Sequence, residues 1–267
     1  MQYGAMNFPV KPLLEEIRKI GERGFDYVEL AMDPPEATPE KVRERKEEIL
    51  RILKQYGMGL VVHLPTFVST ADLSQRLREA SLREIFAAMD VGIVLGVRKM
   101  VLHPGYVTGM AVFVRERAKL HALESLQRIY ERACELGVTL CLENLPPRTS
   151  FCDDLDDFAE LFSRFPELKL TLDTGHANLA TRGKGSIAFL TKLGERLGHL
   201  HFNDNLGKED THLPVGAGTI EFEDIIQEIV RIGYDDTLTV EVFSRDRDHV
   251  RSSREKIKTL LRRYATR

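Results

Sequence analysis

Six predicted strands of this chain end in a side chain that can bind a metal ion, and the spacing of these ends restricts the fold. The six residues follow one another at intervals of 28 to 40 positions and are His63, His103, Glu143, Asp173, His201 and Glu241. A parallel (β/α)8 barrel, the TIM barrel, brings the carboxyl ends of all its strands to one face. In such a barrel the six side chains converge, so the sequence predicts a site that the fold itself assembles.

Short apolar runs alternate with longer amphipathic segments along the whole chain, as in repeated βα units. Strands are expected at Tyr3–Phe8, Asp26–Leu30, Gly59–His63, Lys99–His103, Val138–Glu143, Lys169–Asp173, His199–Phe202 and Leu238–Val242. Helices are expected at Pro12–Arg23, Pro39–Tyr56, Leu73–Leu95, Met110–Leu136, Leu155–Phe165, Ser186–Arg196, Phe222–Ile232 and His249–Tyr264. A usual barrel has about 250 residues, so residues 1–267 are predicted to form one α/β domain, a single (β/α)8 barrel.

Proline and glycine mark the ends of several predicted helices. Pro12 and Pro39 suit a first helical turn, where the missing N–H of proline costs nothing. Glycine is favoured just after a helix, and the candidates for that position are Gly21, Gly57, Gly96, Gly137 and Gly233. Proline therefore marks the start, and glycine the end, of several predicted helices.

Composition excludes several classes of protein. The net charge is −3, so no global field favours nucleic acid or an anionic membrane. The three cysteines are odd in number and lack zinc-knuckle spacing, which fits a reducing compartment better than a disulfide framework. The N-terminus lacks the charged and apolar regions of a signal peptide, and no stretch of about 18 apolar residues occurs. We expect a cytoplasmic protein with no membrane partner.

Two predicted loops are longer than the usual connection of about two to six residues. They are Thr174–Gly185, after the sixth strand, and Asn203–Ile220, after the seventh. They add His176, Asp210 and His212 to the six strand-end residues, which makes nine candidate metal ligands. Imidazole and carboxylate together suit Zn, Mn, Fe or Co, and five of the eight histidines belong to this set.

Glu143 and Glu241 end the fifth and eighth strands, so they approach the centre of the barrel from different sides. A carboxylate pair beside a metal-polarised hydroxy-carbonyl can exchange a proton on an adjacent carbon, as an epimerase or isomerase requires. The alternative is that both glutamates are only ligands. The Asn144 amide and the Arg148 guanidinium follow Glu143 and could hold substrate oxygens, although Arg148 is equally an ordinary loop charge.

Lys208 is a further candidate for binding substrate, in the long loop after the seventh strand. Other basic side chains expected near the barrel top could bind a sugar phosphate, and they are Arg182, Lys184 and Arg245. His199 shares a strand face with His201 one residue pair deeper, so we interpret it as supporting the site from below. Cys141 is interpreted as an inward-facing core residue, and His121 and His249 as surface or packing residues.

The strand ends and the long loop carry recognisable short motifs. They are HLPTF at His63, LHPG at His103, LEN at Glu143, LDTGH at Asp173, HFND at His201, DTHLPVGAGTI at Asp210 and EVF at Glu241. With these motifs the chain resembles the xylose isomerase-like barrel superfamily over essentially its whole length. That superfamily contains sugar and sugar-phosphate isomerases and epimerases, and also endonuclease IV (AP endonuclease family 2).

The resemblance implies two ligand arrangements. In the isomerase and epimerase branch one divalent ion is held by a Glu, an Asp, a His and a second Glu, which match Glu143, Asp173, His201 and Glu241. The two glutamates are also the acid/base pair of that branch. In endonuclease IV nine ligands hold three zinc ions, and the further counterparts here are His63, His103, His176, Asp210 and His212.

The loops resemble the isomerase branch more than the nuclease. Endonuclease IV carries a SYLIN-like segment after its first ligand histidine and an AGQG-like segment after the Glu-Asn pair. This chain has LPTFVST and LPPRTSF there. We therefore predict a metal-dependent isomerase or epimerase of a small keto-sugar, polyol or sugar phosphate, working through an enediolate with one to three ions of Zn, Mn, Co or Fe. The alternative is a zinc phosphodiesterase acting at abasic sites in DNA, and the oligomeric state is left open.

Overall fold

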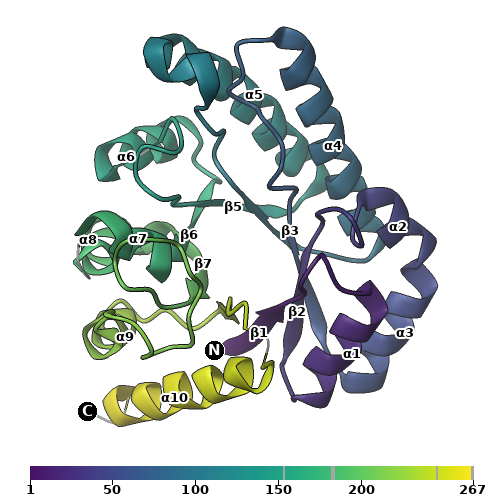
Figure 1. Ribbon diagram of the computed structural model, residues 1–267, viewed down its shortest axis with the longest axis vertical. Coiled ribbons are helices and arrows are strands. Elements are labelled where there is room, and N and C mark those ends of the chain that lie inside the picture. The colour runs from purple at the N-terminus through teal and green to yellow at the C-terminus, as the bar shows by residue number, and fades with distance from the viewer. Residues whose placement is uncertain (153, 182–183, 245, 266–267) are drawn as a thin grey trace.

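Eight parallel strands close into a barrel in the computed structural model of the chain, which describes residues 1–152, 154–181, 184–244 and 246–265 (Figure 1). Each strand pairs with the next one in sequence, and β8 pairs with β1. The strands are β1 Gln2–Met6, β2 Tyr27–Ala31, β3 Gly59–His63, β4 Lys99–Leu102, β5 Thr139–Glu143, β6 Lys169–Asp173, β7 Leu197–Phe202 and β8 Thr237–Val240. The predicted (β/α)8 fold is confirmed.

Helices surround the barrel and connect successive strands (Figure 1). The α-helices are α1 Leu13–Glu22, α2 Pro39–Glu44, α3 Lys46–Tyr56, α4 Gln75–Val94, α5 Arg115–Leu136, α6 Leu155–Arg164, α7 Thr174–Thr181, α8 Gly185–Leu193, α9 Phe222–Arg231 and α10 Asp248–Ala265. Short 3-10 turns precede α5 and follow α8, at Gly109–Val114 (η1) and Gly194–Arg196 (η2).

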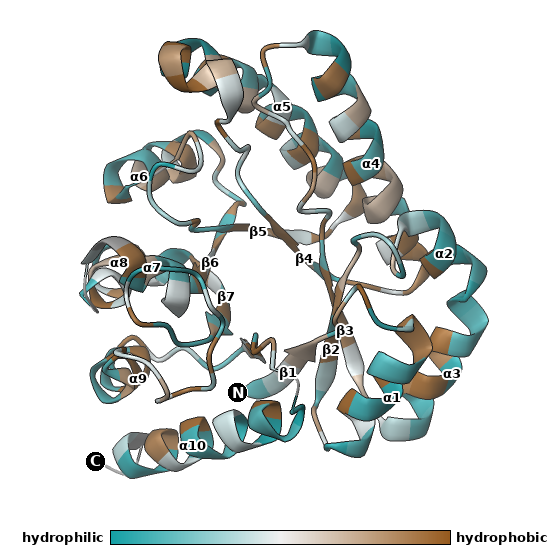
Figure 2. Cartoon of the chain, in the orientation of Figure 1, coloured by the Kyte–Doolittle hydropathy of each residue, from teal (hydrophilic) through white to brown (hydrophobic). Residues whose placement is uncertain are grey.

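Amphipathic patterning decides which side of each helix meets the strands. In α9 the buried residues are Phe222, Ile225, Ile226 and Ile229, an i, i+3, i+4, i+7 set on one face. Burial of each such side chain contributes about 1.5–3 kcal/mol. Figure 2 shows this mixture of hydrophobic and hydrophilic residues on the helices, around strands that are largely hydrophobic. The main core therefore lies between the strands and the ring of helices.

Several predicted boundaries needed correction. The predicted helix Pro39–Tyr56 is two helices, because the chain turns at Arg45, which has φ −94° and ψ 8°. The predicted helix Met110–Leu136 begins as the 3-10 turn η1 and becomes α-helical only at Arg115. Pro12 precedes the first helical residue of α1, whereas Pro39 is the first residue of α2, as predicted.

The prediction that Thr174–Gly185 is a loop was wrong, because most of it is helix α7. Its polar, glycine-containing start obscured the helix, whose first turn is stabilised from the preceding strand. The main-chain N–H of His176 donates to Oδ1 of Asp173 at 2.6 Å, as in a helix N-cap. Residues 182–183 lie outside the described part of the chain. By contrast, Asn203–Ile220 is a long connection between β7 and α9, as predicted.

Among the residues described, no helix has the length and the apolar character needed to cross a membrane.

Gly21 is an interior residue of α1 and not the C-terminal glycine that the sequence suggested. The other four predicted positions, Gly57, Gly96, Gly137 and Gly233, do have positive φ angles after their helices. Gly21 is needed for a different reason, because α1 packs closely on α3. A Cβ at this position would lie 2.4 Å from Cγ of Tyr56.

Gly21→Ala should therefore lower the free energy of unfolding by about 1–3 kcal/mol, the usual cost of overpacking. Urea denaturation of the purified variant measures this change. In a Tyr56→Ala background the steric conflict is absent, and the same substitution should be neutral or stabilise by about 1 kcal/mol through helix propensity. Equal effects of Gly21→Ala in both backgrounds would contradict the close-packing explanation.

Candidate metal centre

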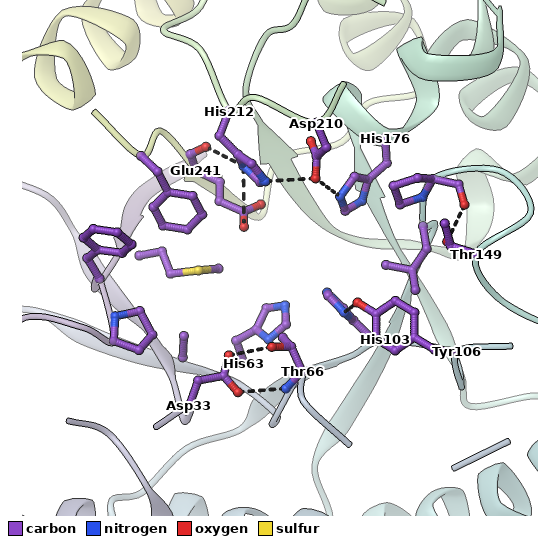
Figure 3. A pocket seen from close by; sticks show the side chains of 17 residues that line it. Asp33, His63, Thr66, His103, Tyr106, Thr149, His176, Asp210, His212 and Glu241 are labelled. Atoms are coloured by element: carbon purple, nitrogen blue, oxygen red, sulfur yellow. Dashed lines mark hydrogen bonds and ion pairs between the residues drawn. The ribbon is translucent and has the colours of Figure 1, made fainter. Parts of the chain in front are cut away.

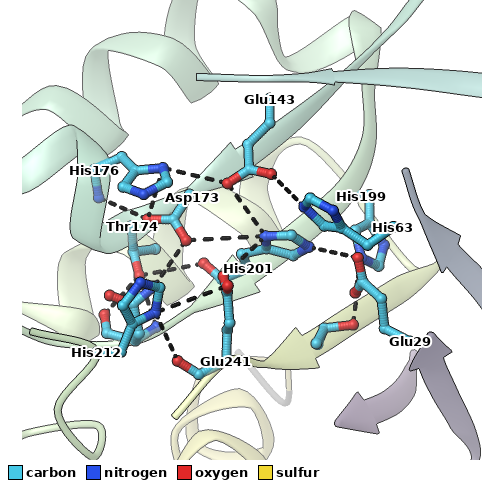
Figure 4. A network of polar contacts seen from close by, with 12 residues as sticks. Glu29, His63, Glu143, Asp173, Thr174, His176, His199, His201, His212 and Glu241 are labelled. Atoms are coloured by element: carbon cyan, nitrogen blue, oxygen red, sulfur yellow. Dashed lines mark hydrogen bonds and ion pairs between the residues drawn. The ribbon is translucent and has the colours of Figure 1, made fainter. Parts of the chain in front are cut away.

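The six strand-end residues lie together at one end of the barrel. His63, Glu143 and Asp173 are the last residues of their strands, and His201 lies in β7. His103 and Glu241 follow β4 and β8 by one residue. Figure 4 shows Glu143, Asp173, His201 and Glu241 directed toward one another from four neighbouring strands. The convergence that barrel geometry predicted is confirmed.

These four side chains form a buried cluster whose ligand atoms all lie within 4.8 Å of one another. Nδ1 of His201 lies 3.1 Å from Oε2 of Glu241, 3.4 Å from Oε1 of Glu143 and 3.9 Å from Oδ2 of Asp173. Although they are close, Nδ1 of His201 and Oε2 of Glu241 make no hydrogen bond within the described chain. Buried polar atoms that face one another without hydrogen bonds fit a cage for a divalent ion.

Glu143 connects this cluster to a second one. Its Oε2 lies 3.2 Å from Nε2 of His63 and 3.2 Å from Nε2 of His103. Its Oε1 lies 3.2 Å from Nδ1 of His176. A single carboxylate thus contacts four histidines, counting His201, which is the arrangement of a carboxylate able to bridge two metal positions.

A third cluster lies at the edge of the barrel mouth. Oδ2 of Asp210 lies 3.0 Å from Nε2 of His176 and 3.1 Å from Nε2 of His212. All nine predicted ligand residues therefore fall into three groups of the right chemistry, with Glu143 common to two of them.

The histidines of these clusters are held by hydrogen bonds on their far sides. Three of them donate the other ring N–H to a main-chain carbonyl: His63 to Leu64 at 3.0 Å, His176 to Asn144 at 2.9 Å, and His212 to Glu241 at 3.1 Å. Metal-binding histidines are usually oriented by such a bond, which fixes the tautomer and the ring plane. This pattern supports metal binding more strongly than the presence of histidine alone.

The clusters shift the pKa values of their members. Burial alone would lower the pKa of His63, but the hydrogen bond and charge of Glu143 raise it to about 9. Burial would also lower the pKa of His212, and the charges of Glu241 and Asp210 raise it to about 9. Burial raises the pKa of Asp173 to about 7. Protons on these groups balance the buried negative charge, and a metal ion would displace them on binding.

Glu143 and Glu241 respond in the opposite direction. Burial would raise the pKa of each carboxyl group. His201 and His103 instead lower the pKa of Glu143, and His212 and His201 lower that of Glu241. Both carboxylates are therefore held in the ionised form that a metal ligand or a general base requires.

Asp204 organises the long β7–α9 loop that carries Asp210 and His212. Its carboxylate accepts hydrogen bonds from the main-chain N–H groups of Asn205, Gly216, Gly218 and Ile220. At Gly218 a Cβ would lie 2.4 Å from that carboxylate, so only glycine fits. The loop is a rigid structure folded around a buried acid, which accounts for much of its DN…GAG pattern.

A pocket of about 360 Å³ opens directly above these side-chain clusters (Figure 3). Its lining includes the ligand residues His63, His103, His176, Asp210, His212 and Glu241. On one side the stacked rings of Phe8 and Phe243 form an apolar wall. Asp33, two residues after β2, also lines the pocket, and its two oxygens accept hydrogen bonds from N and Oγ1 of Thr66 at 2.8 and 2.7 Å.

The predicted substrate-binding residues Asn144, Arg148 and Lys208 are not among the described residues that line this pocket. Both ends of the buried Asn144 amide are hydrogen-bonded to the main chain of Asp173, at 3.0 and 2.8 Å, so this side chain connects β5 to β6. Arg148 and Lys208 are exposed and do not belong to the described lining of the pocket. Arg182 and Arg245 lie outside the described residues. Substrate contacts by these side chains remain predictions.

Sequence reasoning missed Glu29, Asp33 and Tyr106. Glu29 is fully buried in β2, and its Oε1 lies 3.0 Å from Nε2 of His201. A charged residue in the apolar strand YVELA was the available signal. The Tyr106 hydroxyl lies 2.8 Å from Nδ1 of His103 in a hydrogen bond.

His199 lies below His201, as interpreted from strand alternation, and it also contacts Glu29. Cys141 is buried, as expected.

A closed parallel barrel with histidines and carboxylates gathered at the carboxyl ends of its strands defines a TIM-barrel protein with a candidate metal centre. The chain belongs to the xylose isomerase-like TIM barrel family, whose model matches residues 17–264. The resemblance noted in the sequence motifs is thereby confirmed.

Relatives from both branches of the family are similar to the chain. It is 27% identical to an uncharacterised protein of Methanocaldococcus jannaschii, over 90% of this chain and 83% of the relative. It is 24% identical to fructoselysine 3-epimerase of Escherichia coli O157:H7, over 94% of both chains. It is 23% identical to a probable endonuclease 4 of Aquifex aeolicus, over 83% of this chain and 84% of the relative.

Among solved structures, the fold is similar to that of a D-tagatose 3-epimerase-like protein. The TM-score is 0.88 at 25% identity, and the match covers 100% of this chain and 99% of the other.

Asp173→Ala should abolish stabilisation by metal, because it removes a buried carboxylate from the four-residue cluster. The wild-type protein should gain about 2.7 kcal/mol of stability when free metal is at 100 times its dissociation constant. Thermal denaturation with and without zinc or manganese measures this gain, and elemental analysis measures occupancy. Asp224→Ala, on the exposed face of α9, is the matched control. Full occupancy in Asp173→Ala would refute this ligand assignment.

At high zinc concentration the second and third clusters should bind further ions, because their ligand atoms already converge around Glu143 and Asp210. Anomalous diffraction at the zinc edge should show more than one peak, with a spacing of about 3.5–4 Å where two ions share a carboxylate. A single peak in zinc-saturated crystals would assign the additional histidines to substrate binding.

Proposed function

We propose that this chain is a divalent-metal-dependent epimerase or isomerase that acts on a small keto-sugar, a polyol or a sugar phosphate. The proposal rests on one observation: the buried cluster of Glu143, Asp173, His201 and Glu241 adjoins a pocket of about 360 Å³, whose lining includes Glu241. Similarity to fructoselysine 3-epimerase and to a D-tagatose 3-epimerase-like protein supports it.

Glu143, Asp173, His201 and Glu241 would hold the ion. When bound, the ion would polarise a carbonyl and a neighbouring hydroxyl of the substrate and stabilise the negative charge of an enediolate. The two glutamates come from β5 and β8, so they lie on different sides of the substrate carbon. One carboxylate removes the proton and the other returns it, which inverts the carbon or moves the carbonyl.

Glu241 is suited to proton transfer because it lines the pocket and its Oε2 makes no hydrogen bond within the described chain. Glu143 lies deeper and is held by several histidines. His176, His212 and Asp210 lie on the pocket wall, where their polar atoms would contact substrate hydroxyl groups in a one-ion enzyme.

The pocket lining suits a hydroxyl-rich ligand. It combines the acidic side chains Asp33, Asp210 and Glu241 with four histidines, so it offers both acceptors and donors to sugar hydroxyls. The apolar wall of Phe8 and Phe243 would pack against the carbon face of a sugar.

A second candidate is a zinc phosphodiesterase of the endonuclease IV type. The contacts of Glu143 with four histidines favour it, because they resemble a carboxylate shared between two ions. Similarity to the Aquifex aeolicus protein also supports it. Against it, the described lining of the pocket contains no Lys or Arg, the side chains with which proteins normally bind the phosphate backbone of DNA.

The two functions are distinguished by one pair of assays on the same metal-loaded protein. The epimerase proposal predicts that deuterium from the solvent enters one or more members of a panel of keto-sugars and their phosphates. Glu143→Gln and Glu241→Gln should each reduce this exchange by about 10²–10⁴-fold, because each removes a positioned base while keeping its shape. Mass spectrometry of the recovered sugars measures the exchange.

Each variant needs its metal content measured beside its activity, because loss of the ion would also abolish exchange. Glu47→Gln, on the exposed surface of α3, is the control and should retain full exchange. The parallel assay is incision of a DNA duplex with an abasic site. Incision that depends on both glutamates, without deuterium entering any sugar, would replace the epimerase by the nuclease.

A further inference from the structure

A buried polar network lies beneath the candidate metal centre (Figure 4). Its central residue is Glu29, on the inward-facing side of β2 and fully buried. One carboxylate oxygen lies 3.0 Å from Nε2 of His201, and the other lies 2.9 Å from Nε2 of His199. A carboxylate inside a barrel costs several kcal/mol unless it is paired, so its position here requires an explanation.

The two ring nitrogens of His201 face different groups. Nε2 faces Glu29, and an ionised carboxylate only accepts hydrogen bonds, so this nitrogen carries the proton. Nδ1 faces Glu143, Asp173 and Glu241 and makes no hydrogen bond within the described chain. The bond to Glu29 therefore leaves the lone pair of Nδ1 directed into the cluster.

Glu29 is itself held in place from below. Its second oxygen contacts His199, and Nδ1 of His199 lies 2.7 Å from Oγ1 of Thr237 in a hydrogen bond. Both oxygens of the carboxylate are thus engaged, which fixes its orientation toward His201. On their far sides, the other four histidines of the centre bond to neutral groups, namely three main-chain carbonyls and the hydroxyl of Tyr106, whereas His201 bonds to a charged group.

The same residues could in principle form a different metal site, because Glu29, His63 and His201 also offer ligand atoms within 4.8 Å of one another. The contacts oppose that arrangement. Nε2 of His201 is already in a hydrogen bond with Glu29, and Nε2 of His63 lies 3.2 Å from Glu143. The nitrogen without a hydrogen bond is Nδ1 of His201, on the opposite side of the ring.

We propose that Glu29 is a positioning residue that holds the proton of His201 on Nε2 and makes Nδ1 the metal ligand. The inference rests on the metal centre of the proposed function. The charge of Glu29 also makes the imidazole a stronger donor to the ion, as carboxylate partners of metal-binding histidines do. Loss of such a partner typically lowers metal affinity by about 10–100-fold.

Glu29→Gln tests the role of the charge with little change of shape. Its dissociation constant for zinc, measured by competition with a chromophoric chelator, should rise by about 10–100-fold relative to wild type. Ser125→Ala is the control, because it removes buried hydrogen bonds to the main chain of Thr70 and His121 at helix α5 and none in the Glu29 network. Glu29→Gln with unchanged zinc affinity would overturn the proposal, as would an equal loss in Ser125→Ala.

A measurement on the wild-type protein covers the case in which Glu29→Gln does not fold. In protein loaded with ¹¹³Cd and labelled with ¹⁵N-histidine, His201 should show a metal coupling to Nδ1 and a downfield N–H proton on Nε2. Coupling to Nε2 would refute the proposal and favour the Glu29–His63–His201 site. Wild-type protein that binds neither zinc nor cadmium would instead refute the metal centre itself, so the two failures are distinct.

Discussion

Buried negative charge is the constraint on which the rest of this structure depends. Glu29, Glu143, Asp173 and Glu241 lie in the upper half of the barrel with at most 7% of their surface exposed. Unpaired carboxylates in such a place would each cost several kcal/mol. Neighbouring histidines supply the compensating hydrogen bonds and protons, which explains why six of the eight histidines in the chain gather there. The same groups form the candidate metal centre.

The supporting structure keeps these groups in place. Asp173 ends β6, offers one oxygen to the cluster and accepts the N–H of His176 with the other, so a strand, a helix and a ligand set are joined at one residue. Asp204 performs a similar task for the loop that carries His212, through four main-chain N–H groups. Sites held this firmly need little rearrangement when a ligand binds.

The ligand set by itself does not distinguish proton transfer from phosphodiester hydrolysis, because both chemistries use carboxylates and imidazoles around divalent ions. The proposed function rests on the pocket instead. A pocket of about 360 Å³ with an aromatic side and acidic groups such as Asp33 is suited to a hydroxyl-rich small molecule. In TIM barrels generally, the site lies at the carboxyl ends of the strands, and variation of the loops changes the substrate.

The amino-acid sequence alone determined the barrel, its strand ends and the nine candidate ligands, because parallel strands must deliver their carboxyl ends to one face. It did not reveal that Thr174–Thr181 is helical, because the polar, glycine-containing start of this segment hides the cap that Asp173 provides. It also did not reveal that Asn144 joins two strands, because that contact is made with Asp173, 29 residues away. Nor did it reveal Glu29, 172 residues from His201. Only closure of the barrel brings β2 beside the ligands of β7, and the free energy of burying charge then decides which side chains must meet.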